Sequence, residues 1–243
     1  MKFGKLEPKI KYKTLRFRDF AADLPAPPPS WDALAMASAK LPGNPPVGIL
    51  MPMDGNDRVG DCVAAGIAHN VALCQGLIGK WDVLKEEKVL EFYFGLTGGQ
   101  DTGLVMLDAL TWWRKNRVAG DNILGFAKLD PHNHIHVKQT INIFGSVLLG
   151  FQVQADAQAD FAAHKTWTPG PLLEEGHCVL SYKYDDPTVT SATWAGGQPG
   201  TWDWWDETVD EAYGILTAEC LVPGFCPGFD FAAFQKALKA VTA

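Results

Sequence analysis

A cysteine placed where a glycine-containing loop turns into a helix is the first feature of this sequence that suggests chemistry. Cys62 follows Gly60 and Asp61 and opens the apolar stretch CVAAGIAHNVALC. A helix N-terminus presents unpaired N–H groups and a positive partial charge, which favour a thiolate and can hold an oxyanion. Gly60 allows a close backbone approach because it has no Cβ. Cys62 is therefore a candidate nucleophile, and an inert buried cysteine is the alternative.

A histidine far along the chain supplies the second group that a thiol hydrolase needs. His177 follows Gly176 and opens the apolar run HCVLSYKY. Its imidazole could take the proton of the thiol and later protonate the leaving group. Taken alone, a histidine in this position is more often structural than catalytic. Together with Cys62 it forms a candidate catalytic pair.

The first half of the chain is expected to be helical. Apolar residues recur there at spacings of three and four, which is typical of amphipathic helices. Asp61 is a plausible N-cap for the helix that begins at Cys62. The segment between 41 and 61 is rich in Gly and Pro and is expected to be a loop. The expected helices are 31–40, 62–80, 84–96, 103–117 and a short one at 137–144.

The second half changes to short runs rich in Val, Leu, Tyr and Thr that are bounded by turn residues, which predicts strands. The expected strands are 146–153, 177–184, 188–194 and 212–216. A final amphipathic helix is expected at 230–241.

A helical half followed by a strand half predicts an α+β fold in a single domain, with a cleft between two lobes. The helical lobe is expected at about 45–120 and the antiparallel sheet lobe at about 121–216. Residues 1–30 form an extended N-terminal arm, which ends in the proline-rich LPAPPPSWD. Residues 217–243 form a C-terminal extension.

The composition describes a globular protein and restricts its partners. Of 243 residues, 47% are hydrophobic and 20% are charged, and the net charge is −7. This balance argues against nucleic acid and against an anionic membrane surface as partners. The arm is nevertheless basic from Lys2 to Arg18, which indicates either a solvated segment or docking to an acidic surface. No apolar run is long enough for a membrane helix, and no apolar leader opens the sequence, so a cytoplasmic or virion-associated location is expected.

The five cysteines do not form a recognisable disulfide framework, because their number is odd. Cys220 and Cys226 lie close enough in sequence to pair in an oxidising compartment. No CxxC pair indicates structural zinc.

Several stretches together resemble the papain-like cysteine peptidase superfamily over most of the chain. The resemblance rests on the loop-to-helix motif GNDRVGDC, the histidine strand GHCVLSYKYDD, and TWAG followed by DEAYGIL. SWD at 30–32, the helix in ALTWWRKNRVAG and the unit VKQTINIFGSVLLGFQV occur in matching order. The pattern is similar to that of short members in phage and bacterial genomes. The resemblance implies a papain-like fold, no cofactor, and an extended peptide or isopeptide substrate.

The resemblance assigns one residue and leaves another position unmatched. Asn56, six residues before Cys62, stands where the family has the amide of its oxyanion hole, usually Gln. The family orients its histidine with an Asn two residues before the tryptophan, and this chain has Ala192 there. An orienting group fixes the imidazole tautomer, so its loss should weaken catalysis.

Other side chains could replace the missing group. Thr193 or Ser191 could bond to the ring of His177, or Asp203 or Asp206 could reach it from the next segment. The family's tryptophan, at Trp194, would shield the bond that His177 makes; a core tryptophan is the alternative.

Two further clusters invite a functional interpretation. His132, His134 and His136 alternate, and on a strand they would share a face that could bind Zn²⁺ or Cu²⁺; the alternative, which we favour, is a hydrophilic turn entering a strand. The segment 202–211 mixes carboxylates with three tryptophans, which could form a sugar site or simply a solvated face.

The leading hypothesis is a thiol-dependent hydrolase, a cysteine peptidase in which Cys62 attacks a carbonyl carbon, His177 is base and then acid, and Asn56 helps to bind the oxyanion. A catalytically impaired pseudoenzyme, serving as a binding or phage-particle structural module, is the alternative that Ala192 favours. A cell-wall amidase or endopeptidase is a third. About sixty residues precede Cys62, too few for the usual inhibitory propeptide, so control of an active enzyme is expected to lie elsewhere.

Overall fold

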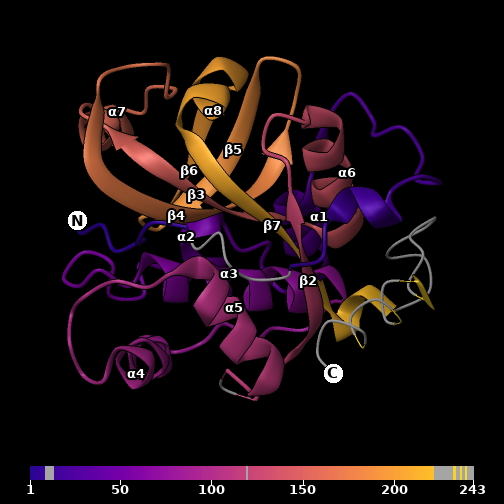
Figure 1. Ribbon diagram of the computed structural model, residues 1–243, viewed down its shortest axis with the longest axis horizontal. Coiled ribbons are helices and arrows are strands. Elements are labelled where there is room, and N and C mark those ends of the chain that lie inside the picture. The colour runs from indigo at the N-terminus through magenta and orange to yellow at the C-terminus, as the bar shows by residue number, and fades with distance from the viewer. Residues whose placement is uncertain (9–13, 119, 222–231, 234–235, 237–238, 240–243) are drawn as a thin grey trace.

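An antiparallel sheet and a group of helices lie on opposite sides of the protein in the computed structural model (Figure 1). The structure describes residues 1–8, 14–118, 120–221, 232–233, 236 and 239. The strands are β1 (Trp31–Asp32), β2 (Ile123–Leu129), β3 (Val147–Gln154), β4 (Leu172–Tyr184), β5 (Thr188–Thr193), β6 (Gly196–Thr201) and β7 (Val209–Thr217). The helices are α1 (Ala33–Lys40), α2 (Val47–Leu50), α3 (Cys62–Leu77), α4 (Glu86–Thr97), α5 (Met106–Lys115), α6 (His134–Phe144), α7 (Ala157–Ala162) and α8 (Trp202–Thr208).

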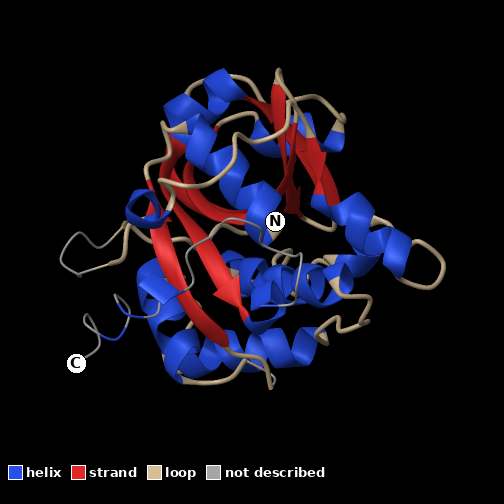
Figure 2. Ribbon diagram, turned by 90° about the vertical axis from the view of Figure 1, so that its right-hand side faces the viewer, coloured by secondary structure: helices blue, strands red, loops and turns tan. Residues whose placement is uncertain are grey.

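The sheet runs in the order β2-β7-β3-β4-β5-β6, and β1 adds to it by pairing with β4. Neighbouring strands are antiparallel throughout. Figure 1 shows α3, α4 and α5 gathered in the lower half of the view, whereas α8 lies with the strands in the upper half. Figure 2 shows the same division from the side, with helices filling the lower part and strands mainly in the upper part. The predicted α+β fold with a helical lobe and an antiparallel sheet lobe is therefore confirmed.

Helix α3 is the central element of the helical lobe, and each of its 16 residues is buried. The expected apolar stripe is thus one part of a helix that is covered on all sides, as its mostly small and apolar composition allows. Gly66 lets the helix approach the sheet, because a Cβ there would lie 2.7 Å from Leu148 Cδ1. This contact sets how closely the first turns of α3, which begin at Cys62, pack against β3.

Local signals account for where several helices begin and end. Asp32 caps α1 by accepting a hydrogen bond from the N–H of Ala35 at 2.9 Å, and Asn133 does the same for α6 from His136. Gly98 and Gly145 end α4 and α6 in the left-handed conformation. Asp61 occupies the N-cap position of α3 but makes no side-chain cap, which corrects that expectation.

Several expected elements differ in extent or type. Residues 31–32 form a short strand rather than the start of α1, and α2 interrupts the expected loop. The histidine-rich segment leads into helix α6, not into a strand, so His134 and His136 do not share a strand face. Trp204 and Trp205 are fully buried on α8, so they form no exposed aromatic floor for a sugar.

The N-terminal arm is more closely packed than a solvated segment. Phe17 and Phe20 lie in a short 3₁₀ helix, Phe17–Phe20, and are buried in the core of the sheet lobe. Residues 1–6, here called the cleft segment, run between the two lobes. Among the described residues, no helix is both long and apolar enough to cross a membrane. The expected helix at 230–241 and the Cys220–Cys226 pair involve residues outside those described.

Candidate active site

The two predicted catalytic residues come from different lobes and meet at one small cavity. Cys62 is the first residue of α3, and His177 lies in β4, where it pairs with Phe151 of β3. Both line a cavity of about 10 Å³, together with Asn56, Thr193 and other residues. That volume is close to the minimum that a single water needs. Cys62 and His177 therefore share a cavity that leaves no room for a substrate.

The imidazole of His177 has one bonded and one unbonded nitrogen. Its Nε2 lies 2.9 Å from the hydroxyl oxygen of Thr193, whereas Nδ1 is buried and has no hydrogen-bond partner among the described residues. A Thr193 hydroxyl that accepts from Nε2–H leaves Nδ1 unprotonated. In that tautomer, the free nitrogen is the one available to take a proton within the cavity.

Aromatic rings enclose the imidazole on several sides. The ring of Trp194 stacks on it with centroids 5.1 Å apart and an angle of 21° between the planes. Phe151 contacts its ring at 5.6 Å, and Phe3 of the cleft segment contacts it edge-on at 5.4 Å. Trp194 therefore covers the Thr193 bond, as a shielding residue would, while also belonging to the core.

Asn56 is held by several partners at once. Its Oδ1 accepts a hydrogen bond from the indole Nε1 of Trp194 at 3.1 Å. Its Nδ2 lies 3.1 Å from the carbonyl oxygen of Lys2 and 3.2 Å from Asp61 Oδ1. Trp194 thus fixes which way the amide faces. The amide N–H of Asn56 already donates to a backbone carbonyl of the cleft segment, which is the kind of group an oxyanion hole receives.

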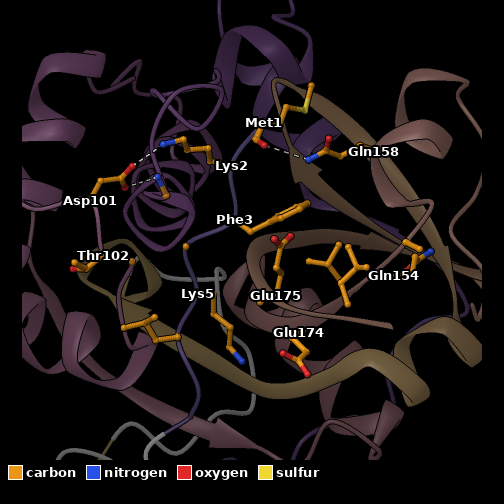
Figure 3. A pocket seen from close by; sticks show the side chains of 18 residues that line it. Met1, Lys2, Phe3, Lys5, Asp101, Thr102, Gln154, Gln158, Glu174 and Glu175 are labelled. Atoms are coloured by element: carbon orange, nitrogen blue, oxygen red, sulfur yellow. Dashed lines mark hydrogen bonds and ion pairs between the residues drawn. The ribbon is translucent and has the colours of Figure 1, made fainter. Parts of the chain in front are cut away.

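The cleft segment pairs with both lobes as an extended strand. The Leu104 N–H donates to Gly4 O at 2.7 Å, and the Leu6 N–H donates to Leu104 O at 2.9 Å on the helical side. On the sheet side, the Lys5 N–H donates to Gly176 O at 3.1 Å. Figure 3 shows the segment along the wall of a pocket of about 700 Å³, where Lys2 forms an ion pair with Asp101.

Close backbone approaches keep the cleft segment in place. A Cβ added to Gly4 would lie 1.6 Å from the carbonyl oxygen of Gly60, so only glycine fits at this position. A Cβ added to Gly60 would in turn lie 2.9 Å from the carbonyl oxygen of Phe3. Gly60 therefore allows a close backbone approach, as expected, and the backbone that approaches it is that of the cleft segment.

Burial sets the charge state of the pair in this closed arrangement. It raises the pKa of the Cys62 thiol to about 12, although the N–H groups of Cys178 and Gly4 oppose the rise. Burial also lowers the pKa of His177 to about 3. Both groups are consequently neutral at pH 7. The low thiol pKa expected at a helix N-terminus is not found here, because desolvation outweighs the helix dipole when the cleft segment covers the sulfur.

A buried polar cluster beneath the site was not predicted from the sequence. His69 Nε2 lies 2.9 Å from Pro52 O and 3.2 Å from Asp54 Oδ2, and it also lines the small cavity. Burial raises the pKa of Asp61, which bonds to Asn56, to about 7. The sequence predicts only a helix-capping role for Asp61. No sequence signal separates such a buried carboxylate from an exposed one.

Other candidates lie away from the imidazole. The hydroxyl of Ser191 lies 2.7 Å from that of Ser181 and not against the ring. Asp206 bonds to Nε2 of His134 at 2.7 Å, at the surface. Among the described residues, no group of three or more His, Cys, Asp or Glu side chains could hold a metal ion. Among the described residues, Thr193 is thus the candidate whose side chain contacts His177 Nε2.

Comparison with solved structures identifies the architecture. The chain is similar to xylellain, a cysteine protease from Xylella fastidiosa, with a TM-score of 0.63 and 15% identity over 89% of this chain and 96% of that one. It is also similar to the cysteine protease CMS1MS2 from Carica candamarcensis, in complex with E-64, with a TM-score of 0.54 and 14% identity over 78% of this chain and 99% of that one. No protein-family model matches the sequence, and no curated protein is similar to it.

These similarities confirm the resemblance to papain-like cysteine peptidases at the level of the fold. The chain has the papain-like arrangement of a helical lobe and a sheet lobe over most of its length. At such low identity, the activity must be argued from the site itself.

Proposed function

We propose that this protein is a papain-like cysteine peptidase that the structure presents in a closed state. The observation that carries the proposal is the meeting of Cys62, His177, Thr193 and Asn56 at one cavity, with the unpaired Nδ1 of His177 buried beside it. Two of these groups are held by a neighbour: Thr193 bonds to the ring of His177, and Trp194 bonds to the amide of Asn56.

The reaction follows from these positions once the cleft segment leaves. Exposure to water removes the desolvation that keeps Cys62 and His177 neutral, so the thiol proton can pass to Nδ1 of His177. The Cys62 thiolate then attacks the carbonyl carbon of a peptide bond, and the electron pair moves to the carbonyl oxygen. The Asn56 amide and the Cys62 backbone N–H stabilise that oxyanion.

The second half of the cycle returns the proton and frees the enzyme. His177 gives its proton to the leaving nitrogen, the C–N bond breaks, and the acyl group stays on sulfur as a thioester. Water, deprotonated by His177, hydrolyses the thioester and restores the thiol. During both steps the imidazolium keeps its Nε2–H bonded to Thr193, whose neutral hydroxyl stabilises the charge less than a carboxylate would.

Residues 1–6 fill the role of an internal inhibitor in this proposal. They cover the cavity with Phe3 and Gly4 and donate or accept backbone hydrogen bonds along both walls. Control, which is expected to lie elsewhere than in the usual propeptide, then lies in these residues. A short segment suffices, because it needs only to span the cleft and not to form a domain.

A pseudoenzyme is the second candidate, and one observation favours it. The orienting partner of His177 is a neutral hydroxyl, and both reacting groups are buried and neutral. In that case, the cleft would stay closed, or would bind peptides without cleaving them.

Hydrolysis by an opened full-length protein separates the two candidates. Gly4→Ala, which cannot seat the cleft segment, would be incubated with a mixed peptide library and with peptidoglycan fragments, and products would be read by mass spectrometry. We expect new peptide termini that disappear in Gly4→Ala/Cys62→Ser and in Gly4→Ala/His177→Ala. Binding of peptides with no cleavage would instead support the pseudoenzyme.

A further inference from the structure

A lysine of the cleft segment is buried in a pocket of its own beside the candidate site. The side chain of Lys5 is 2% exposed, although it carries a charged ammonium group. That group forms an ion pair with Asp210 and lies 3.7 Å from Glu211 Oε1. Lysine is seldom buried unless it is paired, so this pocket is built around a cation.

The pocket owes its shape to a gap in a row of side chains across three strands. Gly150 of β3 pairs with Glu211 of β7 on one side and with Cys178 of β4 on the other, so all three face the same way. A Cβ at Gly150 would lie 2.5 Å from Lys5 Cε, 2.8 Å from Met106 Sδ and 3.1 Å from Glu211 Cγ. The Lys5 stem therefore lies in the space that Gly150 leaves empty.

A second glycine opens the entrance to the pocket. A Cβ at Gly176 would lie 2.9 Å from Lys5 Cδ and 2.5 Å from the backbone oxygen of Lys5. The two glycines and Met106 make a narrow channel that fits an unbranched aliphatic stem. Asp210 and Glu211 lie at its far end, where a long basic side chain places its charge.

The carboxylate at the end of the channel has Lys5 as its ion-pair partner. Glu211 is fully buried, and its Oε2 accepts a hydrogen bond from Tyr213 at 2.8 Å. Its Oε1 has no hydrogen-bond partner among the described residues and faces the Lys5 ammonium group. Burial raises the pKa of Glu211, and Lys5 lowers it, so an occupant without a positive charge would leave this carboxyl without its counter-charge.

The cleft around this pocket also carries negatively charged side chains. Besides the cleft segment, the described residues that line the large pocket include Asp101, Glu174 and Glu175 but no lysine, arginine or histidine. Glu174 and Glu175 lie along the same stretch as Lys5 in Figure 3. The cleft is therefore acidic wherever the segment does not neutralise it.

The pocket lies close enough to Cys62 to receive a side chain of a bound substrate. Lys5 directly follows Gly4, whose N–H points to the Cys62 sulfur. We infer that the pocket formed by Gly150, Gly176, Met106, Asp210 and Glu211 selects a lysine or arginine side chain of the peptide substrate, next to or close to the cleaved bond. This inference rests on the proposed peptidase function, and in the closed state Lys5 occupies the pocket as a substrate side chain would.

The first test compares substrates on the opened protein. Gly4→Ala would be given fluorogenic peptides that carry Lys, Arg, norleucine or Glu at either of the two positions before the cleaved bond. We expect kcat/KM at one position to be at least about tenfold higher for Lys and Arg than for norleucine, the uncharged isostere. Adding Glu211→Gln should remove this preference, whereas Glu207→Gln, an exposed carboxylate on α8, should keep it. Equal rates for Lys and norleucine at both positions would overturn the inference.

A second test needs no catalysis and uses the closed protein. The iodoacetamide labelling rate of Cys62 reports how often the cleft segment leaves. Lys5→Arg should keep the protection, Lys5→Met should raise the rate by about tenfold or more, and Lys2→Met, which removes an exposed ion pair of the same segment, should have little effect. Equal protection by Met and Lys at position 5 would refute a pocket selective for cations. Loss of protection in Lys5→Met, in a protein that cleaves no peptide, would support the pocket and count against the peptidase.

Discussion

The substitution Gly4→Ala tests whether the cleft segment controls access to Cys62. A Cβ at residue 4 would lie 1.6 Å from the oxygen of Gly60 and 2.2 Å from its carbonyl carbon, and both are backbone atoms that cannot rotate away. The segment must therefore move by more than an ångström at this point. Alanine introduces no charge or polar group, so the effect comes from displacement alone.

The size of the effect follows from the hydrogen bonds next to Gly4. The bond from the Leu104 N–H to Gly4 O is 2.7 Å long, and those of Lys5 to Gly176 and Leu6 to Leu104 are 3.1 Å and 2.9 Å. A shift of more than an ångström takes each beyond the range of a hydrogen bond. At about 1 kcal/mol each, the three together stabilise the closed state by about 3 kcal/mol, which corresponds to an increase of about 100-fold in the open population.

The assay is the alkylation rate of Cys62 by iodoacetamide at pH 7.5, mapped by mass spectrometry. In the closed state Cys62 is 1% exposed and its thiol is neutral, so only the open population reacts. We expect Gly4→Ala to label about 100-fold faster than the unmodified sequence. The matched control is Gly95→Ala, since a Cβ at Gly95 in α4 has no neighbour within 4 Å.

Two results would contradict this reasoning. Equal labelling rates in Gly4→Ala and Gly95→Ala would show that the cleft segment does not limit access to Cys62. Fast labelling in the unmodified sequence would show that the segment is already displaced in solution. Circular dichroism of both variants would establish that the fold is retained, so that unfolding does not account for the exposure of the thiol.

Three further predictions concern the groups around His177. Thr193→Val in the opened protein should lower kcat by about tenfold or more, while Thr193→Ser keeps most of it, because only serine retains an acceptor for Nε2–H; steady-state kinetics decide. Burial lowers the pKa of His177 to about 3, below its ordinary 6.5, so the unfolded state binds the extra proton and stability must fall as the pH drops below about 6.5. Urea unfolding at pH 7.5 and pH 5 should show a loss about 2 kcal/mol larger in the unmodified sequence than in His177→Asn, and equal losses would argue against a buried neutral imidazole. Trp194→Phe removes the donor to Asn56 Oδ1 while keeping an aromatic ring, so kcat of the opened protein should fall with KM little changed; a rise in KM alone would place Trp194 in binding.

Much of the fold was predictable because its strongest signals are local. The periodicity of α3 and α5, the runs of Val, Leu, Tyr and Thr in β4 and β5, and the step from loop to helix at Cys62 all depend on neighbours in sequence. The prediction for the histidine-rich segment 132–136 was wrong because it also depended on a local pattern alone. Alternation suggested a strand, whereas Asn133 caps a helix there, and residues as far as Phe144 pack against the sheet.

The sequence limits the hydrogen-bond partner of His177 to a few candidates but does not identify which of them it is. The family's spacing pointed to position 192, where this chain has alanine. In the structure, β5 ends at Thr193, and Trp194 adopts a positive φ of 47°. Thr193 is the side chain that reaches the ring, one residue later than the family's position. A shift of one residue on a strand reverses the face of a side chain, and only the three-dimensional register reveals it.

The closed state itself was beyond sequence reasoning. Residues 1–6 have no periodicity, and their lysines indicate either a solvated arm or a docking segment for an acidic surface. The fit depends on two contacts between residues that are far apart in the sequence. Gly4 packs against Gly60, 56 positions later, and Lys5 lies beside Glu211, 206 positions later. Docking of an external partner through the basic arm stays a prediction, although Lys2 and Lys5 are already paired within the chain.

Detection of an acyl-enzyme tests the central claim most directly. Gly4→Ala would be mixed with a set of N-acyl amino-acid p-nitrophenyl esters, quenched in acid within milliseconds to seconds, and measured by intact mass and peptide mapping. The proposed mechanism predicts a mass increase equal to one acyl group, located on Cys62, that decays with time and is absent in Gly4→Ala/His177→Ala. An opened protein whose Cys62 is accessible to iodoacetamide but never acquires an acyl group would contradict the assignment of this pair as a peptidase site.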